Sequence, residues 1–310
     1  MPSPRVMPVP PRRRVRRPWV ARFPAMFAGL GLLLAFPTSS PASAVESGSG
    51  SKPKPTIVLV HGAWADSSSW SGVVGRLQAS GYTVDVVPNP LRSLPGDAAY
   101  LSAFLHTITG PIVLVGHSYG GAVITNAATG NDQVKALVYI DAFIPDQGES
   151  VVQLAGAQPG SALAVADPTT VFSFVPYPGA PAGDLDAYIL PSVFPGAFAN
   201  DLPARAGAIL AATQRPVTLS ALSTPSGPPA WKAIPSWTLI GTIDQVLPPA
   251  EQQIMAERAH SHITRVKASH LSMIAQPNAV APRHHAAARA TRAAPPVQPH
   301  TAGKERDGEQ

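Results

Sequence analysis

A serine between two glycines is the first feature of this 310-residue sequence with recognisable chemistry. Ser118 stands in GHSYG (116–120), a G-x-S-x-G pattern between the apolar run 111–115 and the small-residue segment 119–129. Between a strand and a helix, this pattern places the serine on a strained turn whose flanking glycines leave no room for a side chain. The turn raises the hydroxyl above the carboxyl edge of the sheet, where the helix N-terminus favours developing negative charge. The pattern therefore predicts a serine nucleophile.

A serine hydroxyl needs a base to activate it, and the base needs an acid to orient it. In a strand–helix topology of this kind the expected chain order is serine, then an acid, then histidine, each after a strand. Asp244 follows the apolar run 236–241 and His270 follows the run 262–267, so both reach the same sheet edge as Ser118. We predict a triad of Ser118, Asp244 and His270. Asp141, which ends the run 134–140, is the alternative acid.

The oxyanion formed during acyl transfer needs two backbone N–H donors. One usually comes from the residue after the serine and the other from the loop after the first strand. These positions hold Tyr119 and Ala63, and we expect their amides to form the oxyanion hole. The side chains of His61 and Trp64 in the same loop are expected to serve in packing.

The remaining histidines receive no catalytic role. His117 is expected to pack beside the serine. His260 and His262 stand too early, at a helix end and a strand start. Their His-x-His spacing suits a metal, but no further ligands are near in the sequence. No metal and no cofactor are therefore predicted.

Short apolar runs alternate with helical segments over most of the chain. The pattern predicts strands at 56–60, 82–87, 111–115, 134–140, 236–241 and 262–267, and helices at 68–79, 97–107, 119–129 and 249–259. Such alternation is typical of an α/β fold with a doubly wound, mostly parallel sheet. Residues 145–235 break it with repeated Pro and Gly, and we interpret them as a cap insertion over the sheet. Its aromatic residues are candidate pocket walls, although aromatic residues of an insertion more often form its own small core: Phe172, Phe174, Tyr177, Tyr188, Phe194, Phe198 and Trp231.

The N-terminal segment reads as an export signal. Residues 1–44 combine arginines with an apolar run of 14 residues, 23–36, and end in the small-x-small sequence Ala-Ser-Ala. A membrane-spanning helix needs about 20 residues, so the run is too short for a retained anchor. We predict a signal peptide at 1–44, a flexible linker at 45–55 and a secreted protein without a stable membrane anchor. Paired arginines leave the twin-arginine route open.

Composition bounds the remaining possibilities. A hydrophobic content of 45% suits a globular domain, and the lack of cysteine excludes disulfides and thiolate chemistry. The net charge of +5 arises in residues 1–44, which hold seven arginines and no acid, so we expect no nucleic-acid partner. We place the folded domain at 56–280. Residues 281–310 contain no Leu, Ile, Met or aromatic residue and are predicted to be a disordered tail.

Four blocks together resemble the α/β-hydrolase superfamily: TIVLVHGAW, GHSYGGAVIT, YIDAFIPDQGES and the pair Asp244 and His270. The similarity covers about residues 56–280 and is nearest to the branch of plant methyl esterases, hydroxynitrile lyases and small bacterial esterases. It implies the α/β-hydrolase fold and a serine carboxylesterase that forms an acyl-enzyme with a small-molecule ester. The family also ends in an amphipathic helix on the sheet, which Pro282 and a polar, basic sequence replace here after residue 280.

Other functions on this fold stay open at the level of sequence. Hydroxynitrile lyases carry a threonine in the first loop and a lysine after the histidine, where this chain has Gly62 and Leu271, so lyase chemistry is disfavoured. Cofactor-free oxidative chemistry could use the same triad. A non-catalytic binding protein of this fold would have no need of the three residues in order.

Overall fold

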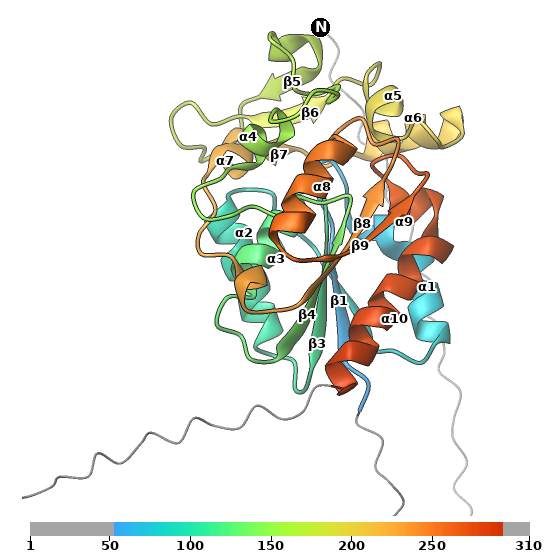
Figure 1. Ribbon diagram of the computed structural model, residues 1–310. Helices are drawn as coiled ribbons and strands as arrows, with labels where there is room; N and C mark the ends of the chain where they lie inside the picture. Colours follow the sequence, from blue (N-terminus) through green and yellow to red (C-terminus); the bar gives the residue numbers. More distant parts are fainter. Residues whose placement is uncertain (1–52, 294–310) are drawn as a thin grey trace, which may run out of the picture. The chain divides into compact units, whose positions relative to one another are not determined.

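The computed structural model describes residues 53–293 (Figure 1). The predicted signal peptide, the linker up to residue 52 and residues 294–310 lie outside the described residues. No helix of the described chain is both long and apolar enough to cross a membrane.

A six-stranded parallel sheet forms the centre of the domain. Its strands are β1 (Thr56–Val60), β2 (Val84–Val87), β3 (Ile112–His117), β4 (Val134–Ile140), β8 (Ser236–Gly241) and β9 (His262–Val266), in the order β2-β1-β3-β4-β8-β9. All neighbouring pairs are parallel, which confirms the predicted doubly wound sheet. The central strand β3 is buried along its whole length, as its continuous apolar sequence requires.

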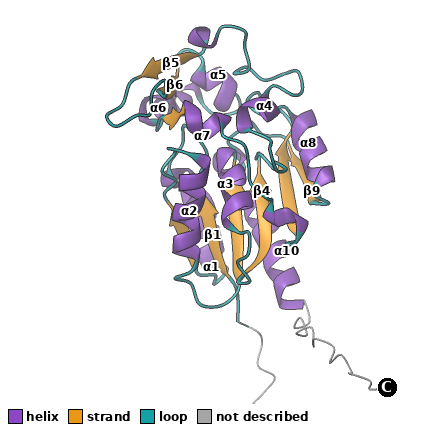
Figure 2. Ribbon diagram, turned by 90° about the vertical axis from the view of Figure 1, so that its left-hand side faces the viewer, coloured by secondary structure: helices purple, strands orange, loops and turns teal. Residues whose placement is uncertain are grey.

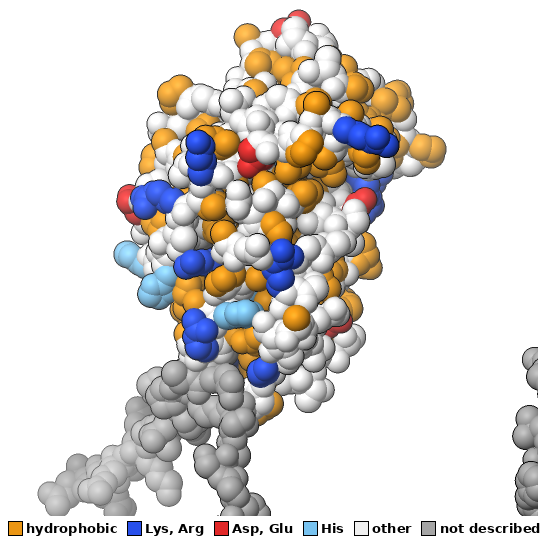
Figure 3. All heavy atoms as spheres, turned by 90° about the vertical axis from the view of Figure 1, so that its right-hand side faces the viewer, with side chains coloured by type: hydrophobic (Ala, Val, Ile, Leu, Met, Phe, Trp, Pro, Cys, Tyr) orange, Lys and Arg blue, Asp and Glu red, His pale blue; other side chains and the backbone are white. Residues whose placement is uncertain are grey.

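Helices cover both faces of this sheet. They are α1 (Ser71–Ala79), α2 (Leu94–Leu105), α3 (Tyr119–Ala127), α8 (Pro249–Arg258) and α10 (Pro277–Ala293). Helices α1 and α10 lie together on one face, and α2 and α3 lie on the other (Figure 1). Two short helices, η1 (Ser67–Trp70) and α9 (Ser272–Ala275), precede α1 and α10. On the face shown in Figure 3, the basic side chains are spread singly among apolar and uncharged ones.

The chain between β4 and β8 forms a cap beyond the carboxyl ends of the strands (Figures 1 and 2). Its core is an antiparallel sheet in the order β5-β6-β7, from β5 (Phe172–Val175), β6 (Asp186–Ile189) and β7 (Val217–Thr218). Around it lie α4 (Val151–Ala155), η2 (Pro168–Thr170), α5 (Phe194–Phe198), α6 (Ala204–Thr213), α7 (Leu219–Ser223) and η3 (Ala230–Lys232). The cap thus faces the edge of the sheet at which Ser118 is placed.

For residues 281–293 the structure corrects the prediction of a disordered tail at 281–310, and residues 294–310 lie outside the described residues. Helix α10 continues to Ala293 and buries Val280, Ala281, His284 and Ala287. Alanine has the highest helix propensity, and its small side chain lets a helix lie close to its neighbours. Burial here therefore does not require the large apolar residues whose absence suggested disorder. Pro282 removes one hydrogen bond of the helix without ending it.

Candidate active site

The turn that carries Ser118 is strained and tightly packed. Ser118 joins β3 to α3 with φ 51° and ψ −125°, a conformation that side-chain-bearing residues rarely adopt. A Cβ on Gly116 would lie 2.5 Å from the Gly120 carbonyl oxygen, and one on Gly120 would lie 2.7 Å from the Val60 oxygen. Only glycine fits at both positions, so the two glycines hold the hydroxyl at the edge of the sheet.

The structure brings Ser118, His270 and Asp244 together. The Ser118 hydroxyl lies 2.8 Å from Nε2 of His270, and Nδ1 of His270 lies 2.7 Å from Oδ2 of Asp244. Because a carboxylate oxygen accepts, Nδ1 carries the proton and Nε2 is free to accept the serine proton. The three side chains are 0–4% exposed, so water competes little with these bonds.

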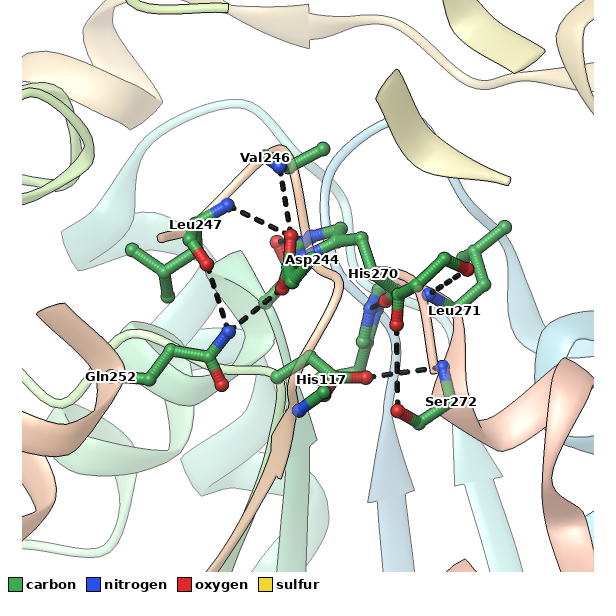
Figure 4. Close-up of polar contacts among 12 residues, drawn as sticks. His117, Asp244, Val246, Leu247, Gln252, His270, Leu271 and Ser272 are labelled. Atoms are coloured by element: carbon green, nitrogen blue, oxygen red, sulfur yellow. Dashed lines mark hydrogen bonds and ion pairs between the residues drawn. The ribbon is translucent and has the colours of Figure 1, made fainter. Parts of the chain in front are cut away.

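Asp244 is held by more than the histidine. Its Oδ1 accepts the backbone N–H groups of Val246 at 2.8 Å and Leu247 at 3.0 Å, and Oδ2 accepts Nε2–H of Gln252 at 2.8 Å (Figure 4). Burial raises the pKa of Asp244, and these donors oppose the shift because they stabilise the ionised form. Gln252 comes from α8 and was not predicted, since no sequence motif marks it.

Burial also sets the state of the imidazole. It lowers the pKa of His270 below the ordinary histidine value, which keeps the ring neutral and able to accept a proton. His117 Nε2–H donates to the His270 carbonyl oxygen at 2.7 Å and so fixes the backbone of the base (Figure 4). Its bond goes to this carbonyl rather than to Ser118.

Asp141, the alternative acid, occupies a different position. It is fully buried with φ 46°, and its two oxygens accept the backbone N–H groups of Gly241 at 2.8 Å and Ser272 at 3.1 Å. Within residues 53–293 it makes no hydrogen bond to His270. Its carboxyl group links the strand before Asp244 to the turn after His270. The contact with the imidazole belongs to Asp244.

The loop after β1 runs directly against the serine. A Cβ on Gly62 would lie 2.6 Å from Cβ of Ser118. His61 fixes the loop, because its Nδ1–H donates to the Gly62 oxygen at 2.9 Å and its Nε2 accepts N–H of Asn89 at 2.9 Å. Burial lowers the pKa of His61 to about 4, which keeps it neutral for both bonds. The His61 side chain therefore holds the loop in place, as the packing role expected from the sequence requires.

Ala63 and Tyr119, the predicted oxyanion residues, line the same cavity as Ser118. Within the described chain neither backbone N–H makes a hydrogen bond. The Tyr119 hydroxyl donates to Oδ2 of Asp97 at 2.7 Å, which anchors the residue that follows the serine.

The cavity above Ser118 has a volume of about 420 Å³ and no charged lining residue. Of the seven aromatic residues proposed as its walls, only Phe172 and Phe174 line it. Phe194 and Phe198 are buried in the core instead. Most of the cap's lining is aliphatic, for example Val151, Leu163 and Leu222, which sequence reasoning did not single out. In the described residues no cluster of three His, Asp or Glu could hold a metal ion.

Comparisons with known proteins give the following findings. Residues 57–283 match the model of the Alpha/beta hydrolase family. A carbendazim hydrolyzing esterase of Nocardioides sp. is 33% identical over 112 residues, which is 32% of this chain and 46% of that protein. A pyrethroid hydrolase of Sphingobium wenxiniae is 33% identical over 105 residues, 30% of this chain and 37% of that protein. The chain thus spans less than half the length of these two relatives.

Solved structures extend the likeness to the whole domain. The crystal structure of polyneuridine aldehyde esterase superposes with a TM-score of 0.64 at 19% identity, covering 76% of this chain and 99% of that one. At this level of identity the likeness concerns the fold. The match extends over nearly all of the neighbour's chain.

Proposed function

This chain belongs to the alpha/beta hydrolase family, and from that premise we propose that it is a carboxylesterase for uncharged, apolar small-molecule esters. One observation carries the proposal. The Ser118 hydroxyl, which lines a cavity without charged lining residues, lies 2.8 Å from Nε2 of the His270 imidazole.

The proposed reaction proceeds through an acyl-enzyme. Ser118 Oγ attacks the ester carbonyl carbon while its proton passes to Nε2 of His270, and the Ala63 and Tyr119 amides bind the resulting oxyanion. The imidazolium then protonates the leaving alcohol as the C–O bond breaks. Water attacks the acyl-enzyme by the same route and releases the acid. Asp244 keeps the imidazole in the tautomer that both half-reactions require.

The cavity supports the choice of substrate class. A charged substrate group would leave water and find no ion-pair partner among the lining residues, which is costly. A volume of about 420 Å³ suits a ligand of modest size. The relatives' names refer to carbendazim and to pyrethroids, and an esterase for neutral compounds agrees with both.

The proposal includes export of the protein. Residues 1–44 have the charge pattern, apolar length and cleavage sequence of a signal peptide. Edman sequencing of the protein recovered from the medium of an expressing bacterium should begin at Val45. Recovery of the chain only from cells, with an intact N-terminus, would contradict export.

A panel of p-nitrophenyl esters together with a fluorophosphonate probe tests the activity. We expect hydrolysis of neutral esters and covalent labelling that peptide mapping assigns to Ser118. An anionic hemisuccinate ester should be a much poorer substrate than the butyrate. A folded protein that neither hydrolyses any ester nor reacts with the probe would overturn the proposal and favour a binding protein.

A further inference from the structure

Trp64 has a backbone conformation that is unusual for an aromatic residue. It directly follows Ala63, and its φ is 55°, in the left-handed region that bulky side chains avoid. The side chain is 7% exposed. Such a conformation is strained and persists only where the surroundings impose it. The contacts of the indole show what imposes it here.

The indole binds the cap at three elements. Its Nε1–H donates to the Ala187 carbonyl oxygen on β6 at 2.9 Å. The ring stacks on Phe172 of β5 with centroids 5.5 Å apart at an angle of 21°. It also contacts the edge of Phe198 of α5, with centroids 5.8 Å apart. A residue of the loop after β1 is therefore attached to a segment more than 100 positions further along the chain.

We infer that Trp64 is a positioning residue, whose attachment to the cap holds the neighbouring Ala63 amide in the direction needed to bind the oxyanion. This inference rests on the proposed esterase function. It goes beyond the packing role expected from the sequence, because the residue that it positions donates to the reacting oxygen.

The loop geometry explains why two anchors are needed. On one side of Ala63, the His61 ring binds N–H of Asn89 and Gly62 lies against Ser118. On the other side, the chain turns through the left-handed conformation of Trp64. Without the bond to Ala187, Trp64 can relax towards an ordinary φ, and the preceding peptide groups turn with it. The amide of Ala63 then loses its orientation even though its own residue is unchanged.

The substitution Trp64→Phe tests the inference because it keeps an aromatic ring for stacking but removes the N–H donor. The matched control is Trp70→Phe, since Trp70 is also buried and its Nε1 has no hydrogen-bond partner within residues 53–293. With p-nitrophenyl butyrate, we expect Trp64→Phe to lower kcat by about 10- to 100-fold. This is less than the loss of about 10²- to 10³-fold found for complete removal of an oxyanion donor, because the Ala63 amide is misdirected rather than removed. KM should change by less than about 3-fold, and Trp70→Phe should keep kcat within about 3-fold.

A second readout separates positioning from a purely structural role. An aryl boronic acid forms a tetrahedral adduct on the serine whose oxygen occupies the oxyanion hole, whereas a neutral amide analogue of the substrate binds without one. Trp64→Phe should weaken the boronate by the same factor as kcat. Because Trp64 also lines the cavity, the affinity for the amide should change, but by less than about 3-fold. A structural defect would weaken both ligands together.

The outcomes are distinct. Wild-type kcat and boronate affinity in Trp64→Phe would overturn the inference, whereas an inactive wild-type protein would overturn the proposed function instead. If Trp64→Phe fails to fold, replacement of Trp64 by 3-benzothienylalanine, which keeps the bicyclic shape and lacks the N–H, carries the same expectation.

Discussion

Two regions around the cavity are built from different interactions. We call Ser118 and the buried residues beneath it, His270, Asp244 and Asp141, the floor, and the lining contributed by residues 145–235 the cap side. On the floor, Asp244 accepts four N–H donors, and Ser118 sits on a turn whose flanking glycines admit no Cβ. On the cap side, the lining is aliphatic and aromatic, with residues such as Leu163 and Phe174. Hydrogen bonds depend on direction, whereas apolar contacts depend mainly on buried area. Substitution of Ser118, His270 or Asp244 should therefore abolish most activity, whereas the cap side should tolerate many substitutions with a change of substrate preference.

The largest expected effect is on the floor. Ser118→Ala removes the nucleophile, and kcat should fall by about 10⁴-fold or more. The melting temperature should not fall, because alanine keeps the Cβ and its packing in the turn and lacks only the hydroxyl group. Ser69→Ala is the control, because Ser69 is also a buried serine but lies in η1, and this variant should keep full activity. Activity of Ser118→Ala within about 10-fold of wild type would show that the floor does not perform covalent catalysis.

The two buried carboxyl groups of the floor should differ next. Asp244→Asn presents an N–H₂ group to the imidazole and favours the wrong tautomer, so kcat should fall by about 10³- to 10⁴-fold. Asp141→Asn loses one backbone hydrogen bond and leaves the imidazole contact intact, so a loss of about 10-fold or less is expected. Steady-state kinetics of both variants decide the assignment. The opposite ranking would make Asp141 the acid.

A substitution on the cap side should change preference rather than rate. Phe174→Ala enlarges the cavity, and the kcat/KM ratio of decanoate to acetate p-nitrophenyl esters should rise by about 10-fold. The kcat for acetate should stay within about 3-fold of wild type. Val175→Ala, at an exposed neighbour on the same strand, should change neither quantity. A large loss of kcat for acetate in Phe174→Ala would break the distinction between floor and cap.

The smallest expected effect is on the pH dependence of activity. It involves a contact between Phe198 of the cap and His270 of the floor. Because burial lowers the pKa of His270, activity should persist below pH 6.5 and disappear only as the imidazole becomes protonated. The ring centroids of Phe198 and His270 lie 4.8 Å apart at an angle of 85°. Phe198→Ala therefore admits water to the imidazole and should move the acid limb of kcat/KM upward. Phe194→Ala, which stacks on Phe198, is the matched control with an unchanged limb. An acid limb at or above 6.5 in the wild type would contradict the shielding of the base.

The sequence predicted those parts of the site that depend on motif and strand order. Ser118 follows from G-x-S-x-G, and Asp244 and His270 follow from their places after parallel strands. The choice between Asp244 and Asp141 stayed open because both end neighbouring strands of the same sheet. Only the fold shows which carboxyl group reaches the imidazole.

Features that depend on side-chain direction could not be predicted. Gln252 reaches Asp244 from α8, and Trp64 reaches Ala187 across more than 100 residues. Neither contact follows from local periodicity. Helix α10 was not predicted for another reason. A lack of large apolar residues indicates disorder, but this helix packs mainly through alanines. The fold class depends on the strand pattern, which was clear, and was confirmed.

The order of the strands in the sheet determines which part of the active site heat should disrupt first. Ser118 follows the central strand β3, but His270 follows β9, the outermost strand, whose residues are only partly buried. Edges of a sheet open locally at a lower free energy than its centre. Fraying of β9 would separate base from nucleophile while the inner strands stay paired. Thermal inactivation should therefore precede loss of the folded core, and the useful lifetime of the protein is set by its edge.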